Sequence, residues 1–143
     1  MIHPERIAEV MGGFAILGHE VRSFQDLETS VAGGLPKVAL RRTLERVYLT
    51  AGDVRQAMHR VVPEATFKRR THLSKTEGER TERLARVIAA AEYVWDDSDD
   101  AREWLTKPHP ELSGRTPMEA AESELGARRV EHVLDSMFYG LPL

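Results

Sequence analysis

The sequence of 143 residues contains no cysteine, so it can form no disulfide, thiolate zinc site or cysteine nucleophile. Long apolar runs are also missing. The most apolar early stretch, Val10 to Gly18, has nine residues and three glycines, whereas a membrane-spanning helix needs about 20 apolar residues. Residues 1–6 carry neither the basic start nor the cleavage site of a signal peptide. We therefore expect a cytoplasmic protein that does not enter a membrane.

No excess of glycine, proline or one charge marks the composition. Ten glycines and seven prolines are near average usage, which excludes a collagen-like or wholly disordered chain. Twenty Lys and Arg against 23 Asp and Glu give a net charge of −3, so the chain is not a uniformly basic nucleic-acid binder. A chain of this length is expected to form one domain or two small ones.

Catalytic and metal-binding motifs are absent too. The sequence has no nucleophile elbow, no phosphate-binding P-loop and no H-E-x-x-H. None of its six histidines has another histidine three or four positions away, so no zinc pair forms on a helix face. We therefore expect no catalytic residue, no metal site and no cofactor.

The acidic run from Asp96 to Asp100 allows two interpretations. A calcium loop starting at Asp96 would need glycine at position 101 and glutamate at position 107, where this chain has Ala101 and Lys107. The favoured interpretation is that Asp97 or Ser98 caps a helix ending near Leu105.

The sequence does contain residues typical of helix starts and ends, and its apolar residues recur at helical spacing. It has no useful run of alternating apolar and polar residues, which would indicate a β-strand. We expect about seven helices and an all-α fold. In the first half we expect a helix at Phe24–Ala32, a second one that carries Leu40, Leu44, Val47 and Tyr48, a third at Val54–Arg60 capped by Asp53, and a fourth at Pro63–His72. In the second half we expect a long helix that starts at a Ser74/Glu77 capping box, a short helix that ends at Leu105, a helix that starts at Thr116-Pro117, and a last helix beyond Gly126. The long helix carries an apolar stripe formed by Leu84, Val87, Ile88, Ala91 and Trp95, and the last one by Val130, Val133, Leu134, Met137 and Phe138.

Charge is distributed unevenly along the chain. The segment from Arg60 to Arg86 has eight basic and four acidic residues, and the segment from Glu92 to Glu124 has ten acidic and three basic ones. Halves of opposite sign suggest two faces for two different partners, although charge-rich solvated helices are the plainer alternative.

The two short helices of the basic segment have the dimensions of a helix-turn-helix, in which the second helix enters the major groove of DNA. If Phe67 faces the core, the polar side chains of that helix point away from it and can contact bases or phosphates. The predicted DNA-binding residues are Arg60, Glu64, Lys68, Arg69, His72, Lys75 and Arg80. A solvated basic helix in a bundle remains the alternative.

The C-terminus is apolar and ends in a free carboxylate. Its residues are Phe138, Tyr139, Gly140, Leu141, Pro142 and Leu143. Such a tail can insert into a pocket of a partner, or it can pack on its own domain or fray.

Several motifs resemble, in order and spacing, the Xre/MbcA/ParS antitoxins that are paired with RES-domain toxins. The matching segments are Gly34-Leu35-Pro36, Thr66-Phe67-Lys68-Arg69-Arg70, Leu73-Ser74 with Glu79-Arg80 and Arg83-Leu84-Ala85-Arg86, Ala101-Arg102-Glu103-Trp104-Leu105 with Pro108, Leu112-Ser113-Gly114-Arg115-Thr116-Pro117-Met118-Glu119, and Gly126-Ala127 with Val130, Val133-Leu134 and Tyr139-Gly140. The chain departs from the family pattern at Val61-Val62, where a glycine is usual, and at Gly78-Glu79, where the family has Ser-Asp.

The resemblance implies an N-terminal Xre-like helix-turn-helix module followed by a small helical toxin-binding and dimerisation domain. The expected division is residues 1–18 as an extension of unknown role, 19–80 as the DNA-binding domain and 81–143 as the antitoxin domain. The implied protein is not an enzyme and needs no cofactor. It forms a homodimer, binds operator DNA to repress its own operon, and neutralises a RES-type toxin that degrades NAD.

The resemblance also favours a role for the tail. The expected toxin-binding residues are Tyr139, Gly140, Leu141, Pro142 and Leu143. The apolar side chains would occlude the toxin active site, and the terminal carboxylate could pair with a basic group that normally holds a phosphate. Two other functions stay open at this point: a dimeric helix-turn-helix transcription regulator without a toxin partner and, with least support, a small hydrolase using the acidic run.

Overall fold

A computed structural model describes residues 2–140, and its regular elements in that range are helices, apart from an isolated antiparallel bridge between Pro36 and His72. The elements are α1 (Pro4–Val10), α2 (Gly13–Leu17), α3 (Phe24–Ala32), α4 (Val38–Glu45), α5 (Ala51–Val61), α6 (Glu64–Arg69), α7 (Lys75–Trp95), α8 (Ser98–Leu105), the 3-10 helix η1 (Pro110–Leu112), α9 (Pro117–Ala120) and α10 (Glu124–Tyr139). The expected all-α class is confirmed. None of these helices is long and apolar enough to cross a membrane.

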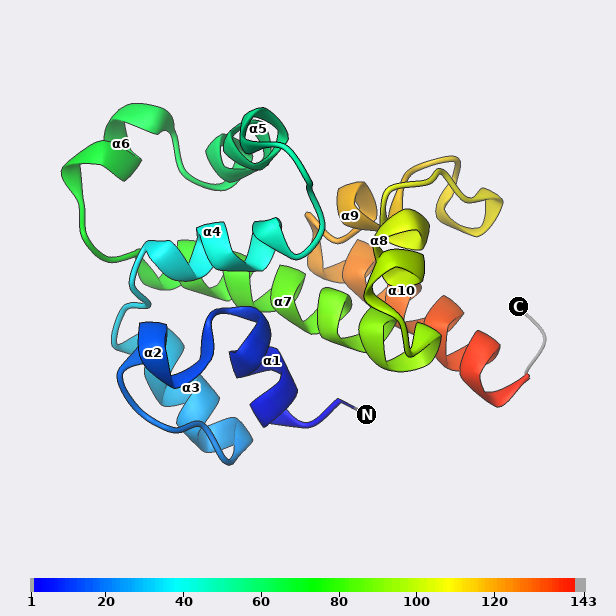
Figure 1. The fold of residues 1–143 in the computed structure, drawn as a ribbon, viewed down its shortest axis with the longest axis horizontal. Helices are drawn as coiled ribbons and strands as arrows, with labels where there is room; N and C mark the ends of the chain where they lie inside the picture. The colour runs from blue at the N-terminus through cyan, green and yellow to red at the C-terminus, as the bar shows by residue number, and fades with distance from the viewer. Residues whose placement is uncertain (1, 141–143) are drawn as a thin grey trace.

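The 21-residue helix α7 is the axis on which the other elements pack (Figure 1). It starts at the predicted capping box, in which the Ser74 hydroxyl accepts from the Glu77 amide while the Glu77 carboxylate accepts from the Ser74 amide. Helices α3, α4 and α5 contact α7, as do α8 and α10. The predicted stripe from Leu84 to Ala91 is buried, but Trp95 is 36% exposed. Trp95 therefore leaves the core, contrary to the sequence-based expectation.

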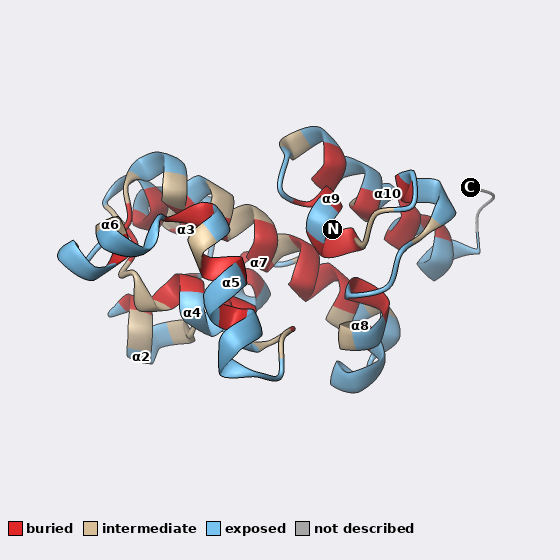
Figure 2. Cartoon of the chain, turned by 90° about the horizontal axis from the view of Figure 1, so that it is seen from above, coloured by how far each residue is buried: buried red, intermediate tan, exposed pale blue. Residues whose placement is uncertain are grey.

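Because α7 spans residues 75–95, it passes through the boundary predicted between residues 80 and 81 without a break. The buried side chains form a continuous core on both sides of that position (Figure 2). The division into two domains at residue 80 stays a prediction.

Three predicted helix ends are wrong. Helix α5 begins at Ala51, because the Thr50 hydroxyl rather than Asp53 provides the cap and accepts from the Asp53 amide. Helix α6 ends at Arg69 instead of His72. Beyond it the Lys37 amide donates to the Thr71 carbonyl and the Leu73 amide donates to the Leu35 carbonyl, at 3.0 and 2.8 Å. This pairing draws the chain into an extended conformation and stops the helix.

The third error concerns Gly126, which lies in the first turn of α10 rather than between two helices. The Ser123 hydroxyl caps α10 by accepting from the Gly126 amide. A Cβ added at Gly126 would lie 1.8 Å from the Ala120 carbonyl oxygen. The glycine is therefore required because α9 and α10 approach each other closely here.

We predict that Gly126→Ala lowers the free energy of unfolding by about 2–3 kcal/mol, the usual cost of overpacking. The melting temperature should fall by roughly 10 °C in thermal denaturation followed by circular dichroism. Gly52→Ala is the matched control, since Gly52 lies in the first turn of α5 with open space around the added Cβ. That change should stabilise the protein by about 0.5 kcal/mol. Equal effects of the two changes would contradict the packing argument.

Residues 2–18 of the predicted N-terminal extension pack into the common core. They form α1 and α2, and Ile7, Val10 and Met11 are almost completely buried in the common core. Helix α1 packs directly against α7. The predicted apolar face of the last helix is confirmed for Val130, Val133 and Leu134, whereas Met137 and Phe138 are largely exposed.

Candidate nucleic-acid interface and partner-binding surface

Helices α5 and α6 form the predicted helix-turn-helix pair, joined by Val62 and Pro63. Val62 is 1% exposed and lies in the turn, where glycine is usual in the family that the sequence resembles. Phe67 is buried and packs edge-on against the His59 ring, with the ring centroids 6.0 Å apart. This orientation leaves Lys68 and Arg69 exposed on the outer surface of α6.

The charges on α6 are available to a ligand. Lys68 forms an exposed ion pair with Glu64 one turn earlier, at 3.3 Å. Exposed pairs of this kind contribute little stability, so a phosphate can displace the carboxylate. The Arg69 guanidinium makes only long hydrogen bonds, of 3.4 Å, to the Ala65 carbonyl and the Thr66 hydroxyl of its own helix.

Two further cations, which the sequence analysis missed, flank the same helix. The Lys37 ammonium donates to the Phe67 carbonyl at 2.8 Å and lies 4.8 Å from the centre of the Phe67 ring. The Arg41 guanidinium lies 5.6 Å from the same ring. Lys37 and Arg41 are four positions apart at the start of α4, and this spacing on one helix face was the available signal. They enlarge the basic surface around α6.

Two more predicted residues follow α6 along the chain, and the second of them, Lys75, also lines a hollow between α3 and α7. His72 is exposed next to the bridge with Pro36, off the helix on which it was expected. Lys75 is exposed at the first position of α7. Arg70 is not free to bind DNA, because it forms a bidentate pair with Glu77 at 2.8 and 2.6 Å. Burial raises the pKa of Glu77, but the Ser74 amide and Arg70 outweigh burial and hold the pKa below its usual value.

Arg60 and Arg80 are held by contacts within the protein, Arg60 with the second half of the chain and Arg80 with the end of α5. The Arg60 guanidinium pairs with Glu122 at 3.0 Å. Arg80 donates to the carbonyl oxygens of Arg60 and Val61, at 3.1 and 3.4 Å, and so caps the C-terminus of α5. Both predicted phosphate contacts are thus engaged within the protein, and their role in DNA binding stays a prediction.

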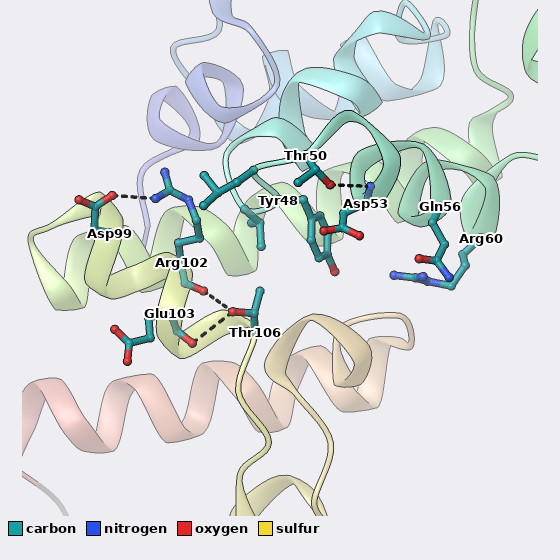
Figure 3. A pocket seen from close by; sticks show the side chains of 11 residues that line it. Tyr48, Thr50, Asp53, Gln56, Arg60, Asp99, Arg102, Glu103 and Thr106 are labelled. Carbon is teal, nitrogen blue, oxygen red and sulfur yellow. Dashed lines mark hydrogen bonds and ion pairs between the residues drawn. The ribbon is translucent and has the colours of Figure 1, made fainter.

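Arg60 also lines a cleft between α5 and α8 (Figure 3). The cleft is bounded by the segment before α5, by α5 itself and by α8, and Tyr48, Asp53 and Arg102 face it. Burial raises the pKa of the Tyr48 hydroxyl, and the adjacent Arg60 only partly offsets this effect. Residues 2–140 contain no cluster of three or more side chains suited to hold a metal ion.

The acidic run from Asp96 to Asp100 contains the cap of helix α8, as the sequence predicted. Asp97 caps α8, because its carboxylate accepts from the Asp100 amide at 2.9 Å. Asp99 pairs with Arg102 in the same helix at 2.7 Å. The run therefore serves helix α8 and does not form a catalytic pair.

A cluster of ion pairs joins α7 to α10. Arg86 contacts Glu131 at 2.6 Å, Glu124 at 3.2 Å and Glu82 at 3.5 Å. Arg83 contacts Glu124 at 3.1 Å. Burial raises the pKa of Glu82, whereas Glu124, in spite of its burial, has a lowered pKa because Arg83 and Arg86 stabilise its charge. The uneven charge along the sequence is therefore partly neutralised inside the fold.

The C-terminal end of α10 presents exposed aromatic side chains. Tyr139 is 63% and Phe138 47% exposed, and their ring centroids lie 5.0 Å apart. Phe138 also contacts the half-exposed Tyr93 of α7, with ring centroids 5.3 Å apart. Gly140 ends the helix with φ 67°, in the left-handed region that favours glycine. The remaining predicted tail residues, Leu141, Pro142 and Leu143, lie outside the described residues.

The basic surface around α6 and the aromatic end of α10 lie at opposite ends of the molecule (Figure 1). Two known domains match these two regions. Residues 26–86 match the helix-turn-helix domain of Xre-like antitoxins, and residues 90–140 match the C-terminal toxin-binding domain of Xre/MbcA/ParS antitoxins. A protein of Pseudomonas putida named antitoxin Xre is 31% identical over 119 residues, which cover 80% of this chain and 72% of the relative. The chain belongs to the Xre antitoxin family.

As an Xre-family antitoxin, the protein is a binding protein rather than an enzyme. Its α5–α6 pair belongs to the DNA-binding helix-turn-helix domain, and α8 to α10 belong to the toxin-binding domain. The match of residues 90–140 decides between the two regulatory interpretations left open by the sequence, since a plain transcription regulator has no toxin-binding domain. Residues 1–25, which include α1 and α2, lie outside both matched domains.

Proposed function

We propose that this antitoxin neutralises a RES-type, NAD-degrading toxin by placing its C-terminal tail in the toxin active site. The observation that carries the proposal is the exposed aromatic end of α10, which leads directly into an apolar tail at the far end of the toxin-binding domain. Tyr139 and Gly140 would position the tail, and Leu141, Pro142 and Leu143 would fill the pocket. A toxin that degrades cytoplasmic NAD places the antitoxin in the cytoplasm as well.

The second part of the proposal is that the antitoxin represses its own operon through α6. Lys68 and Arg69 are free to reach bases and phosphates, Glu64 lies on the same helix, and His72 and Lys75 follow it along the chain. Lys37 and Arg41 add phosphate contacts on one side of the helix. Arg60 and Arg80 contribute less, because DNA would have to compete with their contacts inside the protein. We further propose a homodimer, because a two-fold symmetric operator presents two major-groove half-sites.

We predict that Arg69→Ala and Lys75→Ala affect DNA binding differently. Loss of Arg69 should cost about 1–3 kcal/mol on operator DNA and little on a scrambled duplex, whereas loss of Lys75 should weaken both alike and lower the salt slope by about 1. Fluorescence anisotropy at several salt concentrations separates the two effects. Arg129→Ala, an exposed arginine of α10, is the control. If both test variants bind like the wild type, α6 does not read the operator.

The separation of the two surfaces predicts that DNA and toxin bind at the same time. A gel-shift assay with labelled operator, antitoxin and increasing toxin should show a slower-migrating ternary complex. Displacement of the DNA at stoichiometric toxin would contradict this arrangement.

A further inference from the structure

A groove of about 750 Å³ lies between α1, α7 and α10. Its floor includes Ile7, Ala90 and Leu134, and its rim carries the aromatic side chains of Phe24, Tyr93, Phe138 and Tyr139. Phe24 is 50% exposed although it is a large apolar residue. Clustered exposed aromatic side chains are typical of interaction surfaces.

The groove is built from two parts of the chain, one within the matched toxin-binding domain and one outside both matched domains. The α10 wall and the end of α7 lie within the toxin-binding domain, residues 90–140. The opposite wall is formed by Ile2, Ile7 and Phe24, which lie outside both matched domains. Arg6 of α1 stacks over the Tyr93 ring at 5.1 Å and joins the two parts. The N-terminal segment therefore completes a surface of the toxin-binding domain.

Beyond Phe24 and Arg86 the groove continues as a second hollow between α3 and α7, lined by Glu28, Glu79 and Glu82. Residues 79, 82, 86, 90 and 93 line the two hollows and follow one face of α7 at helical spacing. Glu28 and Glu79 are exposed and form no ion pair among the described residues. The second hollow is also lined by Lys75, and its Glu82 pairs with Arg86. The continuous surface is thus aromatic at one end and carries the unpaired carboxylates of Glu28 and Glu79 at the other.

We propose that this groove receives an elongated segment of the cognate toxin, with bulky apolar side chains at the α10 end and basic side chains at the α3 end. The toxin is the occupant because the aromatic end belongs to the toxin-binding domain and is continuous with Tyr139, where the tail begins. Phe24 and the N-terminal helix determine which toxin is accepted. The inference rests on the proposed neutralisation of a toxin and adds a second contact apart from the tail.

The test measures the dissociation constant of full-length antitoxin for the RES-domain protein encoded beside it, by isothermal titration calorimetry with a catalytically inactive toxin. Phe24→Ala should weaken binding roughly tenfold or more, as truncation of an interface anchor does. Glu79→Lys should also weaken binding and make it less sensitive to salt. Phe14→Ala is the matched control, because Phe14 is 64% exposed in α2 and does not line the groove. Circular dichroism checks that each variant is folded.

The possible results distinguish toxin binding through the groove from neutralisation through the tail. If the wild type binds and the Phe24 variant binds equally well, the groove proposal is overturned while neutralisation by the tail stands. If the wild type does not bind the toxin, both proposals fail. If Phe24→Ala dissociates a homodimer in light scattering without changing the affinity for toxin, the groove is a self-association face and the proposal is overturned.

Discussion

An antitoxin that lacks Leu141, Pro142 and Leu143 will remain folded but will no longer protect cells from its toxin. The physical reason is that the shortened chain keeps every residue of the described core and of α10, which ends at Tyr139 with Gly140 as its cap. In the toxin the three deleted residues would occlude the active site and supply a carboxylate for a charge-assisted contact. We expect co-expression of the shortened chain to give at least about a 100-fold loss of colony formation, because a loss of binding near 3 kcal/mol raises the dissociation constant by about that factor and leaves most of the toxin unbound.

Extension of the tail by Gly-Ser is the companion variant, because it keeps every native side chain and moves only the terminal carboxylate. Partial protection by the extended chain would assign part of the effect to that charge. The melting temperatures of both variants should match the wild type. Full protection by the shortened chain would move neutralisation from the tail to another surface of the toxin-binding domain.

The second large effect is expected from Arg86→Met, which removes the charge at the centre of the α7–α10 cluster. Glu82, Glu124 and Glu131 would then face one another without their shared cation. Removing one partner of a buried ion pair costs about 3–5 kcal/mol, and the Arg86 side chain is 26% exposed. We therefore expect the free energy of unfolding to fall by about 3 kcal/mol, near the lower end of that range, as measured by urea denaturation.

Arg128→Met provides the control for Arg86→Met, because Arg128 pairs with the same Glu124 at 3.7 Å but its side chain is 70% exposed. It should cost less than about 1 kcal/mol, as exposed pairs do. The Arg86 variant should also be less destabilised at acid pH, where protonation removes the repulsion between the carboxylates. Equal losses in the two variants at neutral pH would contradict a stabilising role for the cluster.

The sequence predicted the fold class and several helix starts because their causes are local. The capping boxes at Ser74 and Thr116 and the cap at Asp97 depend on hydrogen bonds within one turn, and all three are present. The errors have different origins: the start of α5 depends on a local cap at Thr50, whereas the other two depend on packing between neighbouring elements. The end of α6 depends on pairing of residues 71–73 with residues 35–37, and the position of Gly126 depends on its contact with Ala120.

The candidate site was predicted in part for the same reason. Lys68 and Arg69 are exposed on α6 as their spacing indicated. The contacts of Arg60 with Glu122 and of Arg80 with the end of α5 join residues about 20 to 60 positions apart and leave no local signal. The same holds for the N-terminal wall of the groove, because nothing in residues 1–18 indicates that they pack beside α10. Long-range packing therefore decided which of the predicted residues face outward.

The most direct test of the proposed neutralisation is an NAD-consumption assay with the proposed RES-type toxin and increasing amounts of the purified antitoxin. We expect NAD consumption to stop at a fixed ratio of antitoxin to toxin. The antitoxin chain lacking residues 141–143 should leave the rate of NAD consumption unchanged. Undiminished NAD consumption at saturating full-length antitoxin would contradict the proposed neutralisation.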